Sequence, residues 1–450
     1  MGLTHCALGI GHYALYNIFM YLLNYVYFLI ITYFGIKFLY SGGEIVKSPF
    51  NKTVRMRLNG PEMFWCLTFS TGLLAFYAPA GIDLTAIRLM VLEILCFLGL
   101  FVAKDKPIWN YPLKIYAIYL IWITIGCLYS PAPFYGFRVI LKYLYPLLLC
   151  LFASAVVRDK EVFIKSSLWA RLIALISIIF SFVPLLPHLV PGVFMYGTAR
   201  AINYISIMIL SLGLFYFTNE KKKNLIYTII FILPCFIWVL RTSIMGSLVA
   251  IMAFYFIKYK IKSLPIIFGI LILGVVAVFT IPSLRHKMFH DDNVTIEQFK
   301  EGKISEDNVN TNAREAMWKD LERRFYKVHP IIGSGTGTVQ NYMYSHHVFG
   351  GLKVPHSDFI QMKCDNGMIA LILYILCALA VFTHCCVTYW RNVENPVLRL
   401  CAIVTGASIA GVFVTLYSDN TVNYSMATLS MPFGLYGMML GLKKHYLEDE

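Results

Sequence analysis

The chain has 450 residues, of which 58% are hydrophobic and only 14% are charged, and its formal net charge is +14. This composition excludes an ordinary soluble protein and is typical of a membrane protein with long apolar helices. A membrane β-barrel would instead show weak alternation over short segments. The positive charge lies in alternate short loops, which indicates membrane topology rather than nucleic-acid binding.

Thirteen apolar runs approach the ~20 residues that a helix needs to cross a bilayer. The first run is long enough to span and no basic segment precedes it, so we expect no cleavable signal peptide. If the first run does not span, twelve spans remain. The predicted spans are 13–40, 62–80, 84–103, 113–129, 137–157, 163–186, 203–218, 224–240, 243–257, 264–281, 367–390, 398–417 and 426–442.

Basic residues divide the loops between the spans into two alternating sets. The positive-inside rule places the lysine- and arginine-rich set in the cytoplasm, together with the C-terminus. The other set holds single arginines, Arg138, Arg200 and Arg241, and is expected outside. The N-terminus is then outside with thirteen spans and inside with twelve.

The interval 282–366 is the one long polar stretch, and it falls on the outer side with the single arginines. Its first part has mixed charge and low hydrophobicity. A helix is predicted after that, because apolar residues recur near helical spacing at Ala313, Met317, Leu321 and Phe325. Loops of this length are usually functional or disordered, and the helix favours a folded cap over the membrane.

The chain is therefore expected to have three parts. Residues 1–281 form an N-terminal transmembrane bundle of about ten spans. Residues 282–366 form the external cap, which includes a glycine-rich turn, GSGTG, at 333–337. Residues 367–450 form three further spans and a short cytoplasmic tail.

A histidine motif leads into the span at 367–390. His356 and Ser357 are followed by nine residues and Gly367, and Ala370 lies three positions further on. This pattern resembles the O-antigen ligase and O-antigen polymerase family of membrane glycosyltransferases. In that family a His and an Asn, Ser or Gln are followed by nine residues, a Gly, two residues and then a small residue or Tyr. Ala370 is a mild departure from the usual Gly, Thr or Tyr.

A second motif upstream resembles the same family. Arg314 is followed four residues later by Trp318, and then by Pro330 and the glycine-rich turn at 333–337. The detailed resemblance covers roughly residues 200–370, and the topology agrees over the whole chain. The resemblance implies an all-α polytopic membrane protein with about 12–13 transmembrane helices. One long periplasmic loop containing short helices completes this GT-C-like architecture.

The resemblance also implies a chemistry. The donor is a glycan linked to undecaprenyl diphosphate, and a hydroxyl of an acceptor sugar displaces the diphosphate with inversion. The acceptor is a lipid A–core sugar for a ligase or another repeat unit for a polymerase, and the sequence favours neither. No metal or other cofactor is expected, so arginines must hold the diphosphate, whose oxygens match the guanidinium group. The enzyme would lie in the bacterial inner membrane with its active site facing the periplasm.

His356 and Arg314 are the predicted catalytic residues. A base near the acceptor hydroxyl should titrate near neutrality, and histidine does so. The plain alternative for His356 is a helix-capping or packing histidine. For Arg314 it is a solvated helix face on which the arginine pairs with Glu315 or Asp320.

Arg200, Arg241 and Arg138 are the predicted diphosphate ligands. Arg200 can instead be an interfacial anchor, since arginine commonly snorkels at the ends of spans. Arg241 lies in a hairpin so tight that it must sit at or below the membrane surface, where an unpaired guanidinium is costly. Arg138 is a further candidate from the same side.

Other polar residues on this side have weaker interpretations. His346 and His347 could join a metal site, but no carboxylate or cysteine spacing supports one. The glycine-rich turn could cradle phosphate through its N–H groups, although a plain tight turn is the simpler interpretation. Asp419, Asn420 and Asn423 could contact sugar hydroxyls.

A different class of function is a polysaccharide flippase or other secondary transporter. Such a protein should carry ionisable residues near mid-membrane in both halves. Mid-span charges are sparse here, with Lys142, Arg171 and His384 as the main cases. The sequence therefore favours an enzyme.

Overall fold

The computed structural model describes residues 45–47, 53–55, 60–71, 84–103, 105–182, 197–237, 239–289, 295, 298, 301, 314–346, 352–424 and 427–448. The predicted span 13–40 and nearly all of the polar segment 290–312 lie outside these ranges. Within them the fold is almost entirely helical. The strands described are the short antiparallel pair β1 (Ile45–Lys47) and β2 (Thr53–Arg55).

Long helices overlap each predicted span from 62–80 onward. They are α2 (Gly60–Thr71), α3 (Leu84–Val102), α4 (Tyr111–Leu128), α5 (Pro133–Val156), α6 (Lys160–Phe182), α8 (Gly197–Phe217), α9 (Lys221–Ile237), α10 (Arg241–Tyr259), α11 (Leu264–Thr280), α17 (Asp358–Arg391), α18 (Pro396–Ser418) and α20 (Ala427–Glu448). The shorter elements are η1 (Lys260–Ser263), α12 (Pro282–Met288), α14 (Arg314–Leu321), η3 (Glu322–Tyr326), α15 (Thr338–His346) and α19 (Thr421–Tyr424).

Five stretches of the described residues are long and apolar enough to cross a membrane. They are Tyr111–Leu128, Pro133–Val156, Arg241–Thr280, Asp358–Arg391 and Pro396–Ser418. The chain is therefore an all-α polytopic membrane protein, as predicted. The total of 12–13 spans stays a prediction.

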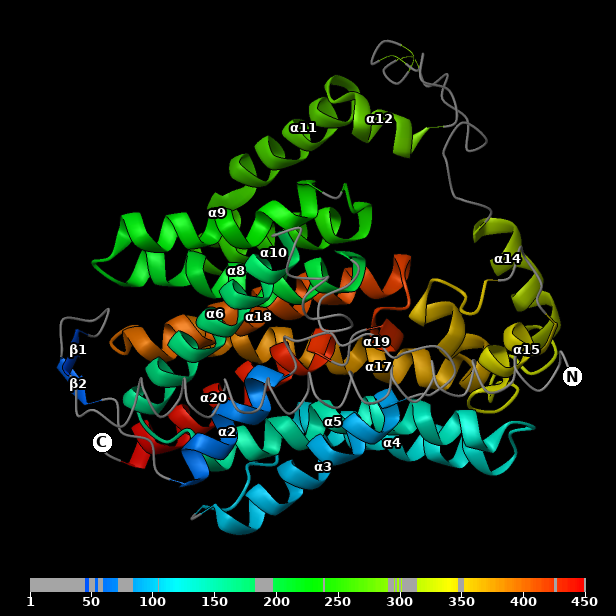
Figure 1. Cartoon of the computed structure of the whole chain (residues 1–450), viewed down its shortest axis with the longest axis horizontal. Helices are drawn as coiled ribbons and strands as arrows, with labels where there is room; N and C mark the ends of the chain where they lie inside the picture. Colours follow the sequence, from blue (N-terminus) through cyan, green and yellow to red (C-terminus); the bar gives the residue numbers. More distant parts are fainter. Residues whose placement is uncertain are drawn as a thin grey trace, which may run out of the picture.

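Helix α18 lies in the middle of the bundle, where it packs against α8, α10, α17 and α20 (Figure 1). It crosses α10 at very close range, because a Cβ added to Gly411 of α18 would lie 2.6 Å from the carbonyl oxygen of Gly246 in α10. Small residues at such crossings let membrane helices approach closely. The crossing brings the start of α10 beside the end of α18, where Ser418 Oγ donates to Thr242 Oγ1 at 3.3 Å.

The basic loops contact one another at one end of the bundle. Arg158 and His445 both contact the carboxylate of Asp105, which joins three of these segments. The ammonium of Lys260 lies 4.9 Å from the ring centre of Trp390, which joins two more. These contacts agree with the division of the loops into two sets, and the orientation of the sets in a membrane stays a prediction.

A second, smaller core lies at the opposite end, at the right of Figure 1. Met317 and Leu321 of α14 are buried there against Val339 and Met343 of α15 and Cys364 of α17. The predicted helix thus forms, and η3 continues it as a π-helical turn. The described residues 314–366 around this core are called the cap below.

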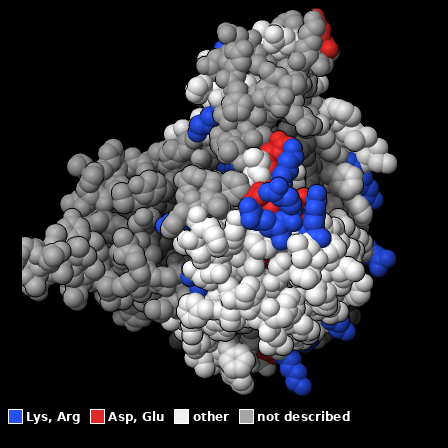
Figure 2. All heavy atoms as spheres, turned by 90° about the vertical axis from the view of Figure 1, so that its right-hand side faces the viewer, with Lys and Arg blue, Asp and Glu red and all other residues white. Residues whose placement is uncertain are grey.

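The outer surface of the cap is charged. Figure 2 shows lysine and arginine side chains gathered at this end around a few acidic ones, above a broad uncharged surface. On α14 and η3, Lys319 pairs with Glu315, and Asp320 pairs with Arg323 at 2.6 Å and with Arg324 at 2.7 Å. Pairs this exposed contribute little stability, about 0–1 kcal/mol each.

Candidate active site

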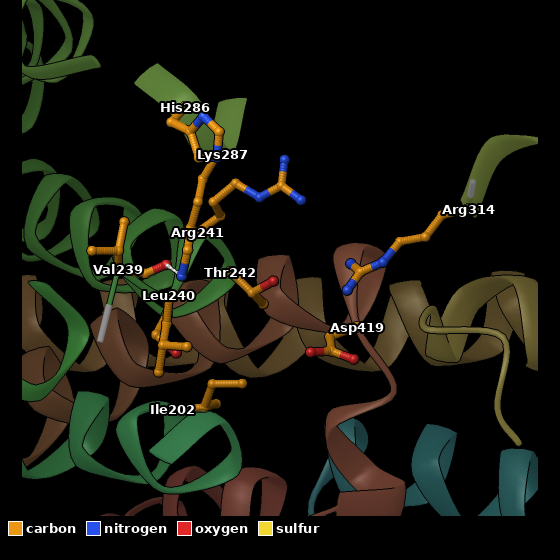
Figure 3. A pocket seen from close by; sticks show the side chains of 10 residues that line it. Ile202, Val239, Leu240, Arg241, Thr242, His286, Lys287, Arg314 and Asp419 are labelled. Atoms are coloured by element: carbon orange, nitrogen blue, oxygen red, sulfur yellow. Dashed lines mark hydrogen bonds between the residues drawn. The ribbon is translucent and has the colours of Figure 1, made fainter. Parts of the chain in front are cut away.

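A cavity of about 380 Å³ lies where the start of α10, helix α12, the start of α14 and the end of α18 meet (Figure 3). Three of its residues are lysine or arginine, one is histidine and one is aspartate. The full lining is Ile202, Val239, Leu240, Arg241, Thr242, Ser243, His286, Lys287, Arg314 and Asp419. The excess of positive charge makes this cavity suited to an anion.

Arg241 enters the cavity from the first turn of α10. The connection from α9 is as tight as the sequence predicts, because α9 ends at Ile237. Val239 in this connection has φ +48°, which is an outlier for a β-branched residue. Figure 3 shows the side chains of Arg241 and Arg314 reaching toward one another from opposite sides of the cavity.

Arg314 enters from the cap, as the first residue of α14. Its Nη1 donates a hydrogen bond of 2.6 Å to the carbonyl oxygen of Ser418, at the end of α18. The alternative of a solvated ion pair does not hold, because Glu315 and Asp320 pair with other residues of the cap. Arg314 therefore ties the cap to the bundle at the edge of the cavity.

His356 lies beside the cavity and contacts Asp419, which lines it. The two atoms His356 Nδ1 and Asp419 Oδ1 are 3.1 Å apart. An ionised carboxylate can only accept a hydrogen bond. In the neutral imidazole tautomer that donates to it, the hydrogen is on Nδ1 and the lone pair is on Nε2. His356 has φ +52°, a conformation that L-residues rarely adopt and that is found at functional sites.

His356 does not cap the helix that follows it. That role belongs to Ser357, whose Oγ accepts a hydrogen bond from the backbone N–H of Ile360 at 3.2 Å. The capping alternative for His356 is therefore wrong. Trp318 of the upstream motif donates to the carbonyl oxygen of Pro355 at 2.6 Å, so it supports the residue directly before the histidine.

The segment after α18 is held against the start of α17 by a buried polar network. The backbone N–H of Ser357 donates to Asn420 Oδ1 at 2.9 Å. The Asp358 carboxylate accepts from Asn420 Nδ2 at 3.1 Å, from Thr421 Oγ1 at 3.2 Å and from the Val422 N–H at 3.2 Å. These bonds fix Asp419 beside His356.

Asn420 is fully buried in this network, which excludes the sugar contact considered for it. The side chain of Asn423 lies outside the described residues.

The glycine-rich turn is a packing element, and the phosphate-cradle interpretation of it is wrong. Gly333, Gly335 and Gly337 all have positive φ, between +75° and +101°. The Asp365 side chain accepts from the Gly337 N–H at 3.0 Å and from the Val339 N–H at 2.9 Å. The Gly335 N–H donates to the backbone carbonyl of Asp365 at 2.8 Å. The N–H groups of Gly335 and Gly337, which could have held phosphate, therefore bind α17.

Gly367 of the histidine motif divides α17 at a kink. Its φ of +74° and ψ of −173° are not helical, and a Cβ there would lie 2.0 Å from the carbonyl oxygen of Ile331. The N–H of Met368 donates to the carbonyl oxygen of Pro330 at 2.9 Å. Residues 358–366 between the capping serine and this glycine thus form a short helix that joins the cap to the spanning part of α17.

The structure does not bring all predicted anion ligands to the cavity. Arg138 lies in the second turn of α5, where its guanidinium is 5.6 Å from the ring centre of Tyr135, and it does not line the cavity. Arg200 lies in the first turn of α8, and its side chain is outside the described residues. Ile202 of the same helix lines the cavity, so this end of α8 lies beside it.

His286, Lys287 and Ser243 line the cavity and were not predicted. The sequence carries a signal for the first two, since Arg285, His286 and Lys287 directly follow the span 264–281 on the side that is otherwise poor in basic residues. Asp419 was expected only as a possible sugar contact. Of the histidines considered for a metal site, His346 bonds to the Tyr342 carbonyl oxygen and His347 lies outside the described residues.

Residues 226–375 match the family model described as O-antigen ligase. This stretch is similar to the O-antigen ligase domain family. The matched stretch includes Arg241, Lys287, Arg314 and His356, so it supplies most of the charged lining of the cavity and the neighbouring histidine. The resemblance noted in the sequence is confirmed, and a comparison with curated proteins finds no match.

Three of the residues considered for the site lie outside the matched stretch. Asp419, the partner of His356, follows it in the chain, and Arg138 and Arg200 precede it. The match supports a glycosyltransferase-type membrane enzyme that acts on a lipid-linked glycan and an acceptor.

Proposed function

We propose that the protein is an inverting, metal-independent glycosyltransferase that moves a glycan from undecaprenyl diphosphate to the hydroxyl of an acceptor sugar. The observation that carries this proposal is the meeting of two arginines and a histidine–aspartate pair at one cavity. Arg241 and Arg314 face each other across it, and Asp419 in its lining contacts His356. This combination supplies both an anion site and a base.

The arginines would hold the diphosphate. A diphosphate that leaves a sugar gains negative charge, and groups placed to meet that charge lower the barrier most. Arg241 and Arg314 come from separate elements, so each can present its guanidinium to a different phosphate oxygen. Arg200 and Arg138 remain candidate ligands from the same side of the bundle.

His356 would act as the base. Its Nε2 takes the proton of the acceptor hydroxyl while the hydroxyl oxygen bonds to the anomeric carbon. The bond from that carbon to the diphosphate breaks, and its electron pair leaves with undecaprenyl diphosphate. Asp419 orients the imidazole and stabilises the imidazolium, as an aspartate does for other catalytic histidines.

The protein would be a multi-pass protein of a bacterial inner membrane, with this cavity facing the periplasm. The positive-inside rule supports this orientation, since the basic loops gather at the other end. In this arrangement 282–366 is the periplasmic cap on the bundle 1–281, and 367–450 supplies the last spans. The acceptor is lipid A–core for a ligase or a growing glycan for a polymerase.

Reconstitution tests the proposal. The purified protein is incubated with an undecaprenyl-diphosphate-linked oligosaccharide and either core lipid or a second donor, and the lipid-linked products are resolved by mass spectrometry. Transfer to one acceptor, with inversion at the anomeric carbon and no loss of rate in EDTA, is expected. Absence of transfer to either acceptor contradicts the proposal, and inhibition by EDTA that a divalent ion reverses contradicts its metal independence.

A further inference from the structure

A cluster of basic and aromatic side chains lies at the end of the bundle opposite the cavity. Helix α10 runs from Arg241, which lines the cavity, to Lys258 in its last turn, and its 19 residues cover about 28 Å. Helix α18 runs the other way, from Arg399 near its start to Ser418 at its end. Each of these two helices therefore reaches from the edge of the cavity to the cluster.

Aromatic rings of neighbouring helices hold the basic side chains of this cluster. The Lys258 ammonium lies 3.0 Å from the ring centre of Tyr216, at the end of α8. The Arg399 guanidinium lies 4.5 Å from the ring centre of Tyr389, near the end of α17. Both basic side chains are partly exposed. A cation–π contact of this kind holds a charged group in place without neutralising it, so both groups can still bind an anion.

The cluster carries more positive than negative charge. Lys221, at the start of α9, and Arg399 both lie close enough to Lys258 for the charges to repel. None of these three forms an ion pair with a carboxylate in the part of the chain that the structure describes. On the adjoining segments, Glu220 is paired with another lysine of α9, and Glu394 is exposed. Like charges held together without a counter-ion favour a bound anion.

Exposed apolar side chains flank the cluster. Ile261 in η1 is 76% exposed, and Val393 in the loop between α17 and α18 is 64% exposed. Lys260, directly before Ile261, lies 4.9 Å from the ring centre of Trp390, which joins η1 to the end of α17. Arg399 Nη1 donates to the carbonyl oxygen of Val393 at 3.4 Å. Positive charge and apolar surface together suit an amphiphile with an anionic head better than a free anion.

We propose that Lys258, Arg399 and Lys221 bind the phosphate of an anionic phospholipid between the end of α10 and the start of α18. Basic pockets between transmembrane helices on the cytoplasmic side are typical sites for such headgroups. The exposed side chains of Ile261 and Val393 would contact the glycerol and acyl regions of the lipid. The predicted orientation places the site in the cytoplasmic leaflet. The proposal is independent of the proposed glycan transfer.

A bound headgroup would tie the end of α10 to the start of α18. These helices cross at Gly246 and Gly411, and Arg241 of α10 lines the cavity at the other end. A ligand that binds only the folded state stabilises it. Anionic phospholipid should therefore raise the temperature at which the protein unfolds.

Native mass spectrometry of the full-length protein in detergent tests the site. The ligands are dioleoylphosphatidylglycerol, dioleoylphosphatidylcholine and glycerol 3-phosphate, which has the phosphate but no acyl chains. The wild type should bind phosphatidylglycerol about tenfold or more tightly than phosphatidylcholine, and glycerol 3-phosphate should not be retained. Lys258→Gln and Arg399→Gln should each weaken phosphatidylglycerol binding about fivefold and leave phosphatidylcholine binding unchanged.

A matched control separates the site from the general positive charge of this end. Lys106 is an exposed lysine between α3 and α4 at the same end, and it contacts no aromatic ring in the described structure. Lys106→Gln should keep the wild-type affinity. Lys221→Gln removes an exposed charge and should weaken phosphatidylglycerol binding about threefold, so it serves if the other two variants do not yield folded protein. Thermal unfolding without lipid shows which variants are folded.

Four results would overturn the site. The first is equal binding of phosphatidylglycerol and phosphatidylcholine by the wild type. The second is unchanged phosphatidylglycerol affinity in the folded variants of Lys258, Arg399 and Lys221. The third is a loss in Lys106→Gln as large as in these variants, since general charge would then explain the binding. The fourth is retention of glycerol 3-phosphate as tight as that of the lipid, which would indicate a soluble anion instead.

Discussion

Two turns in this protein gather backbone N–H groups, and they use them in opposite ways. In the glycine-rich turn 333–337, those of Gly335 and Gly337 are bonded to Asp365 of α17. In the first turn of α10, Leu240 provides no side-chain cap and Ser243 keeps a buried hydroxyl without a partner among the described residues. The glycine-rich turn holds the cap on the bundle, whereas the α10 turn borders the cavity.

This difference shows that the glycine-rich turn is part of the scaffold, although it is easily recognised in the sequence. Gly333, Gly337 and Gly367 are needed because the backbone approaches too closely for a Cβ. The groups suited to chemistry are side chains brought from distant parts of the chain, such as Arg241, Arg314 and Asp419. Changes in the scaffold should cost stability, and changes at the cavity should cost activity.

His356→Gly should have the largest effect on activity and little effect on stability. Loss of the base should reduce glycan transfer by about 10²–10⁴-fold. Glycine adopts φ +52° without strain, which offsets part of the loss of the Asp419 contact and of the added entropy of the unfolded chain. The unfolding temperature should therefore change little. Transfer assays and thermal unfolding in detergent measure both effects, and near-wild-type transfer would exclude His356 as the base.

Gly367→Ala should have the largest effect on the scaffold. The new Cβ would meet backbone atoms of Ile331 and Ile332 at a residue with positive φ, so the cap would have to move. We expect a loss of at least ~3 kcal/mol or no folded protein. Gly269→Ala is the matched control, since nothing lies within 4 Å of that position. Equal thermal stability of the two variants would show that the kink is not required.

Arg314→Lys should retain the positive charge but lose the planar guanidinium group with its paired N–H donors. A lysine cannot reproduce bidentate binding to phosphate while also reaching the Ser418 carbonyl oxygen. Transfer should fall about 10–100-fold, with little change in unfolding temperature. Arg323→Lys, on the exposed surface of the cap, should transfer at the wild-type rate. Full activity of Arg314→Lys would indicate that charge alone suffices.

Asp365→Asn should lower stability without removing activity from the folded fraction. The variant weakens two bonds from the Gly337 and Val339 N–H groups, at about 1–3 kcal/mol in total. Unfolding temperature and specific activity of monodisperse protein measure the two quantities. A loss of activity as large as that of His356→Gly would show that the Asp365 carboxylate takes part in catalysis. The glycine-rich turn would then not be a purely structural element.

Arg323→Ala should have the smallest effect. Its ion pair with Asp320 is exposed, and Arg324 pairs with the same carboxylate. The unfolding free energy should change by less than ~0.5 kcal/mol, and transfer should be unaffected. A marked loss of transfer would instead assign the charged surface of the cap to acceptor binding.

The fold could be predicted from the sequence because apolar runs and loop charge report directly on membrane helices. The spans at 84–103, 113–129 and 264–281 differ by only a few residues from the helices that the structure describes. The exception is α17, which begins at Asp358 and kinks at Gly367, so its first part belongs to the cap. A hydropathy pattern does not register a kink that is set by contact with Ile331.

The site could be predicted only where a motif or an unusual charge marked it. Arg241, Arg314 and His356 were found in this way. Asp419 and Ser243 were not assigned these positions, because each depends on the crossing of α10 and α18, which brings together residues far apart in the chain. The sequence analysis assigns no role to Lys287, although its charge is unusual for the predicted outer side.

The thickness of the surrounding bilayer should affect the enzyme through helix α11. Its 17 residues span about 26 Å at the usual rise of 1.5 Å per residue, slightly less than a typical ~30 Å hydrocarbon core. Since none of its residues is buried in the described protein, its depth and tilt should respond to bilayer thickness through hydrophobic mismatch. Because α12 follows directly, acyl-chain length should tune how far Lys287 reaches, so turnover should vary with membrane thickness.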